Sequence, residues 1–248
     1  MPHQEVYYTP PELIDSNAGV LKITGQEAHH LRNVVRHTSG DKVIVVDGCG
    51  KAYRVTLSLE DKGIITGAIE KEESGWGESR MAIGVIIPPL KGHRMDTVIE
   101  KGTELGVSTF YIPNTKNAVA RVTTSKLDRW HRITLSAMKQ CCRSVCPSIQ
   151  SFTDLEEALT AIKAIDITVL YADMEKPILS RSMFPEDFFQ KASNAGVVVA
   201  VGPEGGFSDE EIAIINNYRA IPFGLGPRRL RSDTAVMAAL AQINCLFL

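Results

Sequence analysis

From Met81 onward, short apolar runs alternate with segments in which apolar residues recur every three or four positions. The runs have the length of strands and are rich in β-branched residues, which is typical of buried parallel strands. The segments between them predict amphipathic helices that cover a sheet. This alternation therefore predicts an α/β domain with a parallel sheet. Its strands are expected at residues 83–87, 109–112, 167–171, 197–201 and 221–225.

The N-terminal part of the chain follows a different pattern. Apolar and polar residues alternate from Tyr53 to Leu59, as in a half-buried strand, and residues 43–46 are all apolar. Residues 73–80 are charged and contain glycines, which is typical of a linker. We therefore predict a small, mainly β domain over residues 1–72, a linker over 73–80 and the α/β domain over 81–248.

Three capping boxes predict where helices begin, because a hydroxyl at the start and a carboxylate three residues later satisfy free backbone amides. The first predicted helix carries an apolar face of Leu31, Val34 and Val35 and ends before Gly40. The boxes are formed by Thr24 and Glu27, by Thr153 and Glu156, and by Ser208 and Glu211.

Two glycine-bearing turns follow the last two predicted strands. The first reads Gly202-Pro203-Glu204-Gly205-Gly206-Phe207, and the second spans residues 224–231 and carries three arginines. Because parallel strands end at one edge of a sheet, both turns and Ala172-Asp173-Met174 are expected there together.

The turns alone leave two interpretations open. The glycines can serve only to turn the chain, or they can bare backbone amides for a ligand. The chain has no G-x-x-x-x-G-K-[ST] motif, and Gly224-Leu225-Gly226 does not extend to G-x-G-x-x-G. This disfavours a P-loop nucleotide hydrolase and an ordinary dinucleotide-binding protein.

The two turns also carry a family resemblance. The segments V-G-P-E-G-G-F at 201–207 and L-G-P-R-R-L-R-S-D-T-A at 225–235 resemble the signature motifs of the ribosomal RNA small-subunit methyltransferase E family. Further similar segments are K-G-T-E-L-G-V at 101–107, Gln140 to Arg143 with Pro147, and H-H-L-R-N-V-V-R at 29–36 with Gly40-Asp41. The resemblance covers nearly the whole chain in the expected order.

This resemblance implies a fold and an activity that periodicity does not reveal. It implies a PUA-like barrel that recognises RNA, followed by a SPOUT-type methyltransferase domain whose last helix threads a trefoil knot. It further implies that the chain methylates N3 of a uridine in 16S ribosomal RNA with S-adenosylmethionine, as a homodimer and without metal. It implies 16S ribosomal RNA or the small ribosomal subunit as the partner, and it leaves open whether naked RNA or the assembled subunit is the substrate.

Composition changes this picture little. The 248 residues include 27 basic and 29 acidic ones, so bulk charge does not indicate non-specific RNA coating. Five cysteines without a C-x-x-C pair or a histidine cluster favour a reducing compartment and disfavour zinc. No apolar segment predicts a signal peptide or a membrane span, so we expect a cytoplasmic protein.

The resemblance and the chemistry together predict catalytic residues. Removing the N3 proton of uridine leaves negative charge on the flanking oxygens, which Arg231 could stabilise. The alternatives for Arg231 are a salt bridge to Asp233 or a charge at a helix start. Glu204 could accept a donor hydroxyl, act as a base or cap the next helix. Asp233 stands where the family has glutamate, which shortens its reach.

The resemblance also implies cofactor contacts. Arg228 could bind a phosphate or the carboxylate of the donor, whereas Arg229 replaces an aliphatic residue of the family and is discounted. The full predicted set is Leu170, Gly202, Pro203, Glu204, Gly205, Gly206, Leu225, Gly226, Arg228, Leu230 and Thr234.

RNA contacts are expected on two helices. Arg32 and Arg36 give the first helix a basic side. Gln140 and Arg143 match a family pair, for which the resemblance implies a role that faces either RNA or the second copy of a dimer. For Arg143 the alternative is a cation that stabilises a helix C-terminus. The family often has an arginine near the N-terminus that faces RNA, and Pro2-His3-Gln4-Glu5-Val6-Tyr7-Tyr8 contains none, so the sequence does not predict that contact.

Two rival functions remain at this point. The first is a catalytically silent RNA-binding or ribosome-assembly protein that retains the knot, against which the intact glycine turns and Arg231 argue. The second is an α/β enzyme of a small nucleotide, against which the separate β domain argues.

Overall fold

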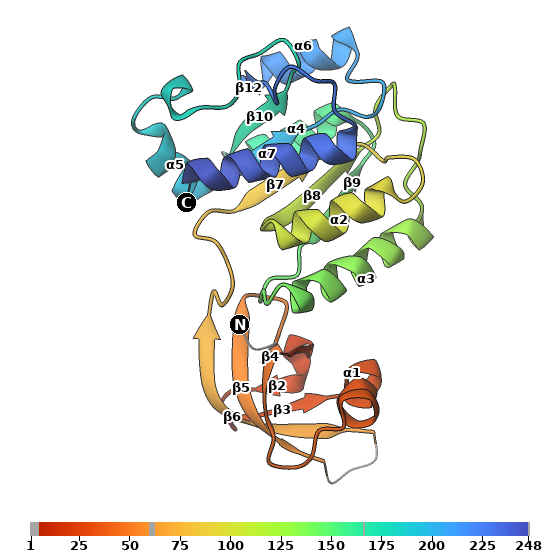
Figure 1. The fold of residues 1–248 in the computed structure, drawn as a ribbon, viewed down its shortest axis with the longest axis vertical. Coiled ribbons are helices and arrows are strands. Elements are labelled where there is room, and N and C mark those ends of the chain that lie inside the picture. Colours follow the sequence, from red (N-terminus) through yellow and green to blue (C-terminus); the bar gives the residue numbers. More distant parts are fainter. Residues whose placement is uncertain (1–4, 60–62, 166, 248) are drawn as a thin grey trace. The chain divides into compact units, whose positions relative to one another are not determined.

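The computed structural model describes residues 5–59, 63–165 and 167–247. The chain divides into two compact units (Figure 1). The first runs to Glu78 and also includes Leu135–Cys146 from the middle of the chain, and the rest forms the second unit. The predicted boundaries at residues 72 and 80 stay predictions. The three residues Pro2-His3-Gln4 lie outside the described ranges.

The first unit is built on a curved six-stranded sheet with the order β1-β4-β5-β6-β3-β2. The pair β1 and β4 is parallel, and the other neighbours are antiparallel. The family resemblance implies a PUA-like barrel, and the described strands form an open half-barrel of this kind, with β1 and β2 at its two edges. Its strands are β1 (Val6–Tyr8), β2 (Ile14–Asp15), β3 (Val20–Ile23), β4 (Lys42–Val46), β5 (Lys51–Ser58) and β6 (Ile65–Ser74), with a short helix η1 (Pro11–Leu13) before β2.

The predicted helix near Thr24 forms in two parts, α1 (Gly25–His29) and the π-helical η2 (His30–Val35). The capping-box prediction is wrong here, because the Thr24 side chain makes no capping hydrogen bond. The Glu27 carboxylate instead accepts hydrogen bonds from Lys139 Nζ and, at 3.3 Å, from the backbone N of Tyr8. The apolar face is also narrower than predicted, since Leu31 is buried but Val34 is 60% exposed.

The second unit contains a fully parallel sheet with the order β12-β10-β11-β7-β8-β9, which confirms the predicted fold class. All five predicted strands form. The sixth, β9, was not predicted because this edge strand has no run of apolar residues and buries none of its side chains fully. The strands are β7 (Ile83–Ile86), β8 (Val107–Pro113), β9 (Ser148–Phe152), β10 (Thr168–Ala172), β11 (Val197–Ala200) and β12 (Ile221–Phe223).

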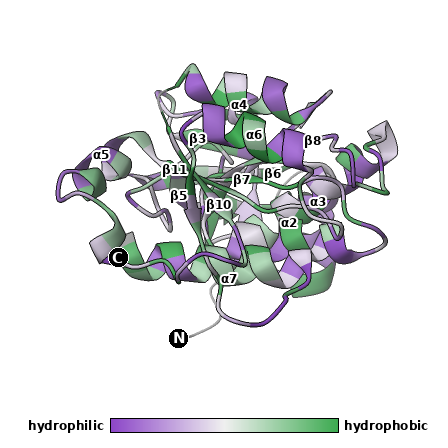
Figure 2. Ribbon diagram, turned by 90° about the horizontal axis from the view of Figure 1, so that it is seen from above, coloured by the Kyte–Doolittle hydropathy of each residue, from purple (hydrophilic) through white to green (hydrophobic). Residues whose placement is uncertain are grey.

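Helices cover both faces of this sheet. Figure 2 shows α4 and α6 on one side of the central strands and α2 and α7 on the other. The helices are α2 (Arg94–Glu104), α3 (Thr124–Gln140), α4 (Leu155–Lys163), η3 (Arg181–Met183), α5 (Phe188–Ala195), α6 (Asp209–Asn217) and α7 (Ser232–Phe247).

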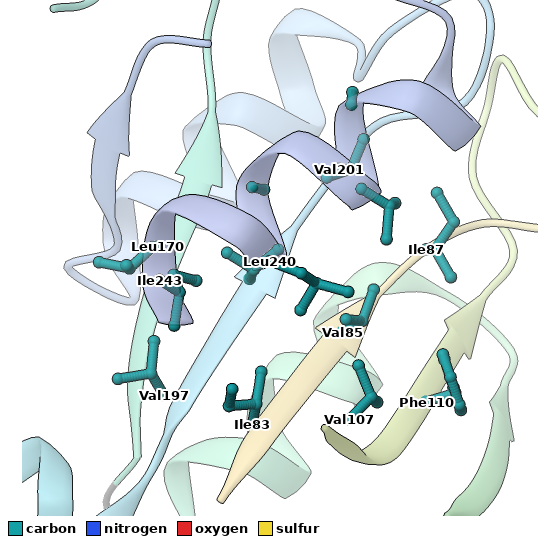
Figure 3. Packing of buried hydrophobic residues seen from close by; sticks show 14 of the residues in the cluster. Ile83, Val85, Ile87, Val107, Phe110, Leu170, Val197, Val201, Leu240 and Ile243 are labelled. Carbon is teal, nitrogen blue, oxygen red and sulfur yellow. The ribbon is translucent and has the colours of Figure 1, made fainter. Parts of the chain in front are cut away.

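The apolar side chains of the strands alternate between two cores, as the pleat of a sheet requires. On β11, Val197 and Val199 pack toward α7, whereas Val198 and Ala200 pack toward α4 and α6. Leu240 and Ile243 of α7 lie against the first of these cores (Figure 3). This two-sided burial explains why the central strands have apolar residues at consecutive positions.

Two helix starts in this unit test the remaining capping boxes. The box of Ser208 and Glu211 is confirmed, with both reciprocal hydrogen bonds present. The box of Thr153 and Glu156 is wrong by one residue: Asp154 is the N-cap, and its side chain accepts from Glu157 N at 2.8 Å. The trefoil knot expected from the family resemblance stays a prediction.

Candidate active site

A cavity of about 500 Å³ lies where β10, β11 and β12 end. The three segments that follow these strands form its walls, as the sequence predicted for the carboxyl edge of the sheet. Val201 and Ala235 come from the buried core beneath it. The lining consists of Ala172, Asp173, Met174, Val201, Gly202, Pro203, Glu204, Gly205, Gly206, Leu225, Gly226, Arg228, Arg229, Leu230, Arg231, Ser232 and Ala235.

The first wall is the turn at residues 202–206, which is held from outside the cavity by Asn117. The Asn117 side-chain amide donates to the carbonyls of Gly205 at 3.3 Å and Gly206 at 3.1 Å. A Cβ at Gly205 would lie 2.9 Å from the Cβ of Asn117. Glycine is thus required at position 205 by a protein neighbour, before any ligand is considered.

The second and third walls touch each other at Gly224. Its backbone N donates to the Pro177 carbonyl at 2.7 Å, and a Cβ there would clash with the Lys176 carbonyl. Next to this contact, Asp173 N donates to the Phe223 carbonyl at 2.9 Å. The glycine therefore lets the segment after β10 and the segment after β12 close one side of the cavity.

Three arginines of the third wall, Arg228, Arg229 and Arg231, are exposed and line the cavity. None of them forms an ion pair with any residue that the structure describes. The family resemblance does not favour Arg229 as a site residue, yet Arg229 lines the cavity with the other two arginines. Their charges give this wall a strong attraction for anions.

Glu204 is held by residues that the sequence did not indicate. Its Oε1 lies 2.8 Å from Arg94 Nη1 and accepts a weaker hydrogen bond from Lys91 N at 3.4 Å. Its Oε2 is buried and has no hydrogen-bond partner among the described residues. No local pattern could have found Arg94, since 110 positions separate the two side chains.

Three predicted site residues do not line the cavity. Leu170 is fully buried in the core of the sheet (Figure 3). The carboxylate of Asp233 accepts from Thr234 N at 3.0 Å, at the start of α7. Thr234 itself is exposed outside the lining. Their assigned roles stay predictions, and the structure gives Asp233 a helix-start position that suits a carboxylate.

Two titratable side chains close to the site have shifted pKa values. Burial raises the pKa of Tyr171 at the end of β10, and the charge of Asp173 adds to this effect. A hydrogen bond to Glu210 of α6 raises the pKa of Lys116.

The four predicted RNA-binding residues lie in the first unit and differ in exposure. Gln140 and Arg36 are exposed, and Arg36 has a left-handed backbone with φ of 66°. Arg32 donates to the Leu59 carbonyl at 3.3 Å.

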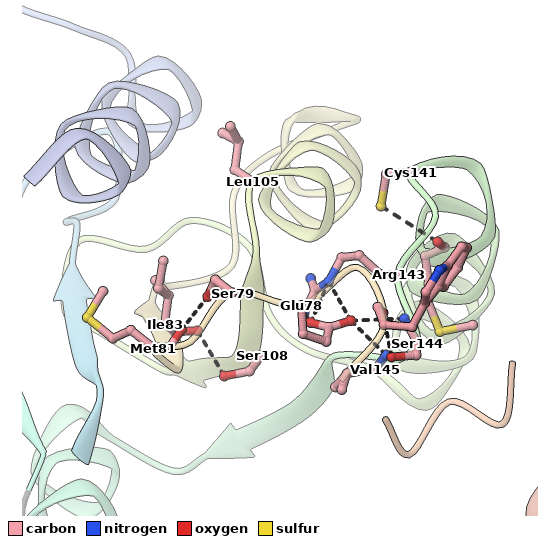
Figure 4. A network of polar contacts seen from close by, with 12 residues as sticks. Glu78, Ser79, Met81, Ile83, Leu105, Ser108, Cys141, Arg143, Ser144 and Val145 are labelled. Carbon is pink, nitrogen blue, oxygen red and sulfur yellow. Dashed lines mark hydrogen bonds and ion pairs between the residues drawn. The ribbon is translucent and has the colours of Figure 1, made fainter. Parts of the chain in front are cut away.

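Arg143 is only 3% exposed, which leaves its guanidinium little surface to offer to RNA. Its Nε and Nη2 donate to the Glu78 carboxylate, whose Oε1 also accepts from Ser144 N and Val145 N, each at 2.9 Å (Figure 4). This geometry makes Arg143 a structural brace, and its contact with RNA stays a prediction.

Among the described residues, no group of three or more histidine, cysteine, aspartate or glutamate side chains could hold a metal ion. No helix formed by these residues is long and apolar enough to cross a membrane.

Comparison with known proteins places this site in a family. A family model described as an RNA methyltransferase domain matches residues 77–244, and one described as an RNA methyltransferase PUA domain matches residues 23–70. A Synechocystis protein named ribosomal RNA small subunit methyltransferase E is 30% identical over 243 residues, covering 96% of this chain and 76% of that protein. The chain belongs to the ribosomal RNA small subunit methyltransferase E family.

Other members of the methyltransferase E family agree with this assignment. The Bacillus subtilis protein of the same name is 26% identical over 231 residues, which cover 92% of this chain and 90% of that one. A crystal structure of the Neisseria gonorrhoeae methyltransferase E bound to S-adenosyl methionine is 26% identical and has a TM-score of 0.84. It covers 99% of this chain and 98% of that one. The family resemblance found in the sequence is therefore confirmed.

Proposed function

We propose that this protein transfers a methyl group from S-adenosylmethionine to N3 of a uridine in 16S ribosomal RNA. The observation that carries the proposal is the cavity at the carboxyl edge of the parallel sheet, walled by two glycine turns and lined by Arg231. Family membership supports an RNA methyltransferase, and the named Neisseria relative supports the donor.

The residues present fit this donor. The cavity volume of about 500 Å³ lies within the usual range for sites of small ligands. Its apolar lining from Val201, Leu225 and Leu230 suits an adenine ring. The buried and unpartnered Oε2 of Glu204 suits a ligand hydroxyl or amino group, since such an oxygen otherwise carries a desolvation cost.

The bound donor would supply an activated methyl group carried on a sulfonium. The protein must then hold the acceptor ring in line and exclude water. Uridine N3 carries a proton at neutral pH, and the charge left by its removal spreads onto the flanking carbonyl oxygens. Arg231 lines the cavity, is exposed and forms no ion pair with the residues that the structure describes, so we assign it the stabilisation of that charge. We assign Arg228 to the donor carboxylate or to an RNA phosphate.

The experiment that tests the function is mass analysis of modified nucleosides in ribosomal RNA from cells with and without the gene. We expect 3-methyluridine to be missing from the small-subunit RNA of cells without the gene. It should return when purified protein and donor are added to that RNA or to small subunits isolated from those cells. Unchanged 3-methyluridine would favour a silent RNA-binding or assembly protein instead.

We also propose that the working protein is a cytoplasmic homodimer. A cavity at the edge of a sheet gains walls from a second copy, and a two-fold arrangement is the commonest one. Light scattering across a concentration series should give twice the mass of 27.2 kDa. A monomer mass with full methylation activity would refute the dimer.

A further inference from the structure

The side chain that fixes Glu204 at the cavity does not itself line the cavity. Arg94 Nη1 and the backbone N of Lys91 both contact the same carboxylate oxygen, Oε1. The other oxygen, Oε2, is buried and accepts no hydrogen bond from any residue within 5–59, 63–165 and 167–247. The carboxylate is thus held by one end only.

The position of Arg94 at the start of α2 indicates that its ion pair with Glu204 is more than a chance surface contact. Arg94 is the first residue of α2, where the partial positive charge of the helix N-terminus disfavours a cation. The carboxylate of Glu204 offsets this charge. A nearby carboxylate of the same helix, Asp96, is already paired with Arg129 at 2.8 Å and with His93 at 3.3 Å.

We propose that Arg94 is a positioning residue for the methyl donor, acting through Glu204. By holding Oε1, it directs Oε2 to accept a hydrogen bond from a ribose hydroxyl of the bound nucleoside. A carboxylate suits this task because it only accepts, and a ribose hydroxyl can donate. The inference deepens the proposed function and rests on it.

The test uses titration calorimetry of the full chain with S-adenosylhomocysteine and with its 2′-deoxy and 3′-deoxy analogues, so that no turnover is needed. In the unaltered protein, removal of the recognised hydroxyl should weaken binding by roughly tenfold to a hundredfold, as expected for a hydrogen bond to a charged group. In the Glu204→Ala and Arg94→Met variants, removal of the same ribose hydroxyl from the ligand should weaken binding by less than about threefold. Methionine keeps an unbranched stem of similar length but no charge.

Two further variants separate positioning from general stability. Arg94→Lys keeps the charge without the fixed fork of a guanidinium. Its preference for the ligand with the recognised hydroxyl over the deoxy analogue should lie between those of Arg94→Met and the unaltered chain. Arg129→Met removes a more exposed arginine that also pairs with a carboxylate, Asp96 of α2. This variant should show the same loss of affinity for the deoxy analogues as the unaltered chain. Thermal melts of all variants check that they fold.

The possible outcomes are distinct. If Arg94→Met binds all three ligands more weakly by one common factor, the contact is a structural brace and the inference is wrong. If the unaltered chain shows no preference for either hydroxyl, Glu204 does not read the ribose and the inference is also wrong. If the unaltered chain binds no ligand at all, the proposed function itself fails, and the inference fails with it.

Discussion

Arg231 and Arg143 differ in where their charges are used. The Arg143 guanidinium is 3% exposed and donates hydrogen bonds from Nε and Nη2 to the Glu78 carboxylate. Arg231 is exposed at the cavity and forms no ion pair with the described residues, Asp233 included. A side-chain charge without an ion-pair partner in the resting protein can stabilise charge in a transition state, whereas a charge already neutralised by a carboxylate cannot.

We therefore expect Arg231 to affect turnover more than folding or donor binding. Arg231→Lys should lower kcat because it loses the planar fork, and Arg231→Ala should lower it by roughly two to three orders of magnitude. Single-turnover methylation of RNA measures this effect, and calorimetry with donor and thermal melts are the controls. A full-rate Arg231→Ala protein would remove Arg231 from the mechanism, and a parallel loss of melting temperature would make it a brace.

Gly205 and Asn117 form a second pair whose effects should be coupled. An alanine at 205 would place its Cβ 2.9 Å from the Asn117 Cβ, and overpacking of this kind costs about 1–3 kcal/mol. We expect Gly205→Ala to lower both melting temperature and donor affinity. Asn117→Gly removes the obstructing Cβ. The losses of melting temperature and donor affinity in the Gly205→Ala, Asn117→Gly double variant should therefore be smaller than the sums of the losses in the two single variants. Strict additivity would show that the clash is relieved elsewhere.

At the scale of elements, sequence patterns predicted the central strands well and the ends of elements poorly. Buried parallel strands are easy to predict because both of their faces are covered, which requires a continuous run of apolar residues. The strand β11, which lies between two cores, is an example. The edge strand β9 lacks that signal. Capping residues mislead where a distant partner competes for them, as Lys139 does for Glu27. The walls of the cavity were predictable from the order of the strands. Arg94 and Asn117, which hold the first wall from outside the cavity, come from other parts of the chain and carry no local signal.

The capping box of α6 gives a prediction at this scale. Ser208 Oγ accepts from Glu211 N at 3.3 Å, directly after the glycine turn of the cavity. Ser208→Ala should lower the free energy of unfolding by about 1 kcal/mol. Urea denaturation of the variant measures this loss, with Ser136→Ala on the exposed side of α3 as the control. Equal stabilities of the two variants would show that Glu211, which also accepts from Lys116 N at 2.8 Å, holds the helix start without the serine.

At the scale of the whole molecule, the two units are not two consecutive pieces of chain. Met138 of α3 is fully buried in a cluster with Val6, Ile44 and Val46 of the first unit. Deleting the N-terminal residues would expose this methionine, which alone costs roughly 1.5–3 kcal/mol of hydrophobic burial. Such a deletion cannot separate RNA binding from stability. No periodicity in α3 shows that its last turns belong to the first unit.

Point variants therefore test whether the first unit binds RNA. Arg36 is exposed and has a left-handed backbone, a conformation that asparagine tolerates, so Arg36→Asn removes a charge without adding strain. We expect this variant to bind small-subunit RNA more weakly and to lower the slope of log affinity against log salt by about 0.7–0.9, the value for one phosphate contact. Donor affinity should not change.

Arg219 offers a matched control in the second unit. It is exposed at the end of α6 and has the same left-handed backbone, with φ of 57° against 66° for Arg36. Arg219→Asn therefore makes the same chemical change at the same backbone geometry. It should leave both RNA affinity and salt slope unchanged. If the two variants lose affinity equally, the loss reflects net charge, since one positive charge is removed in each. The first unit would then lose its assignment as the RNA-binding part.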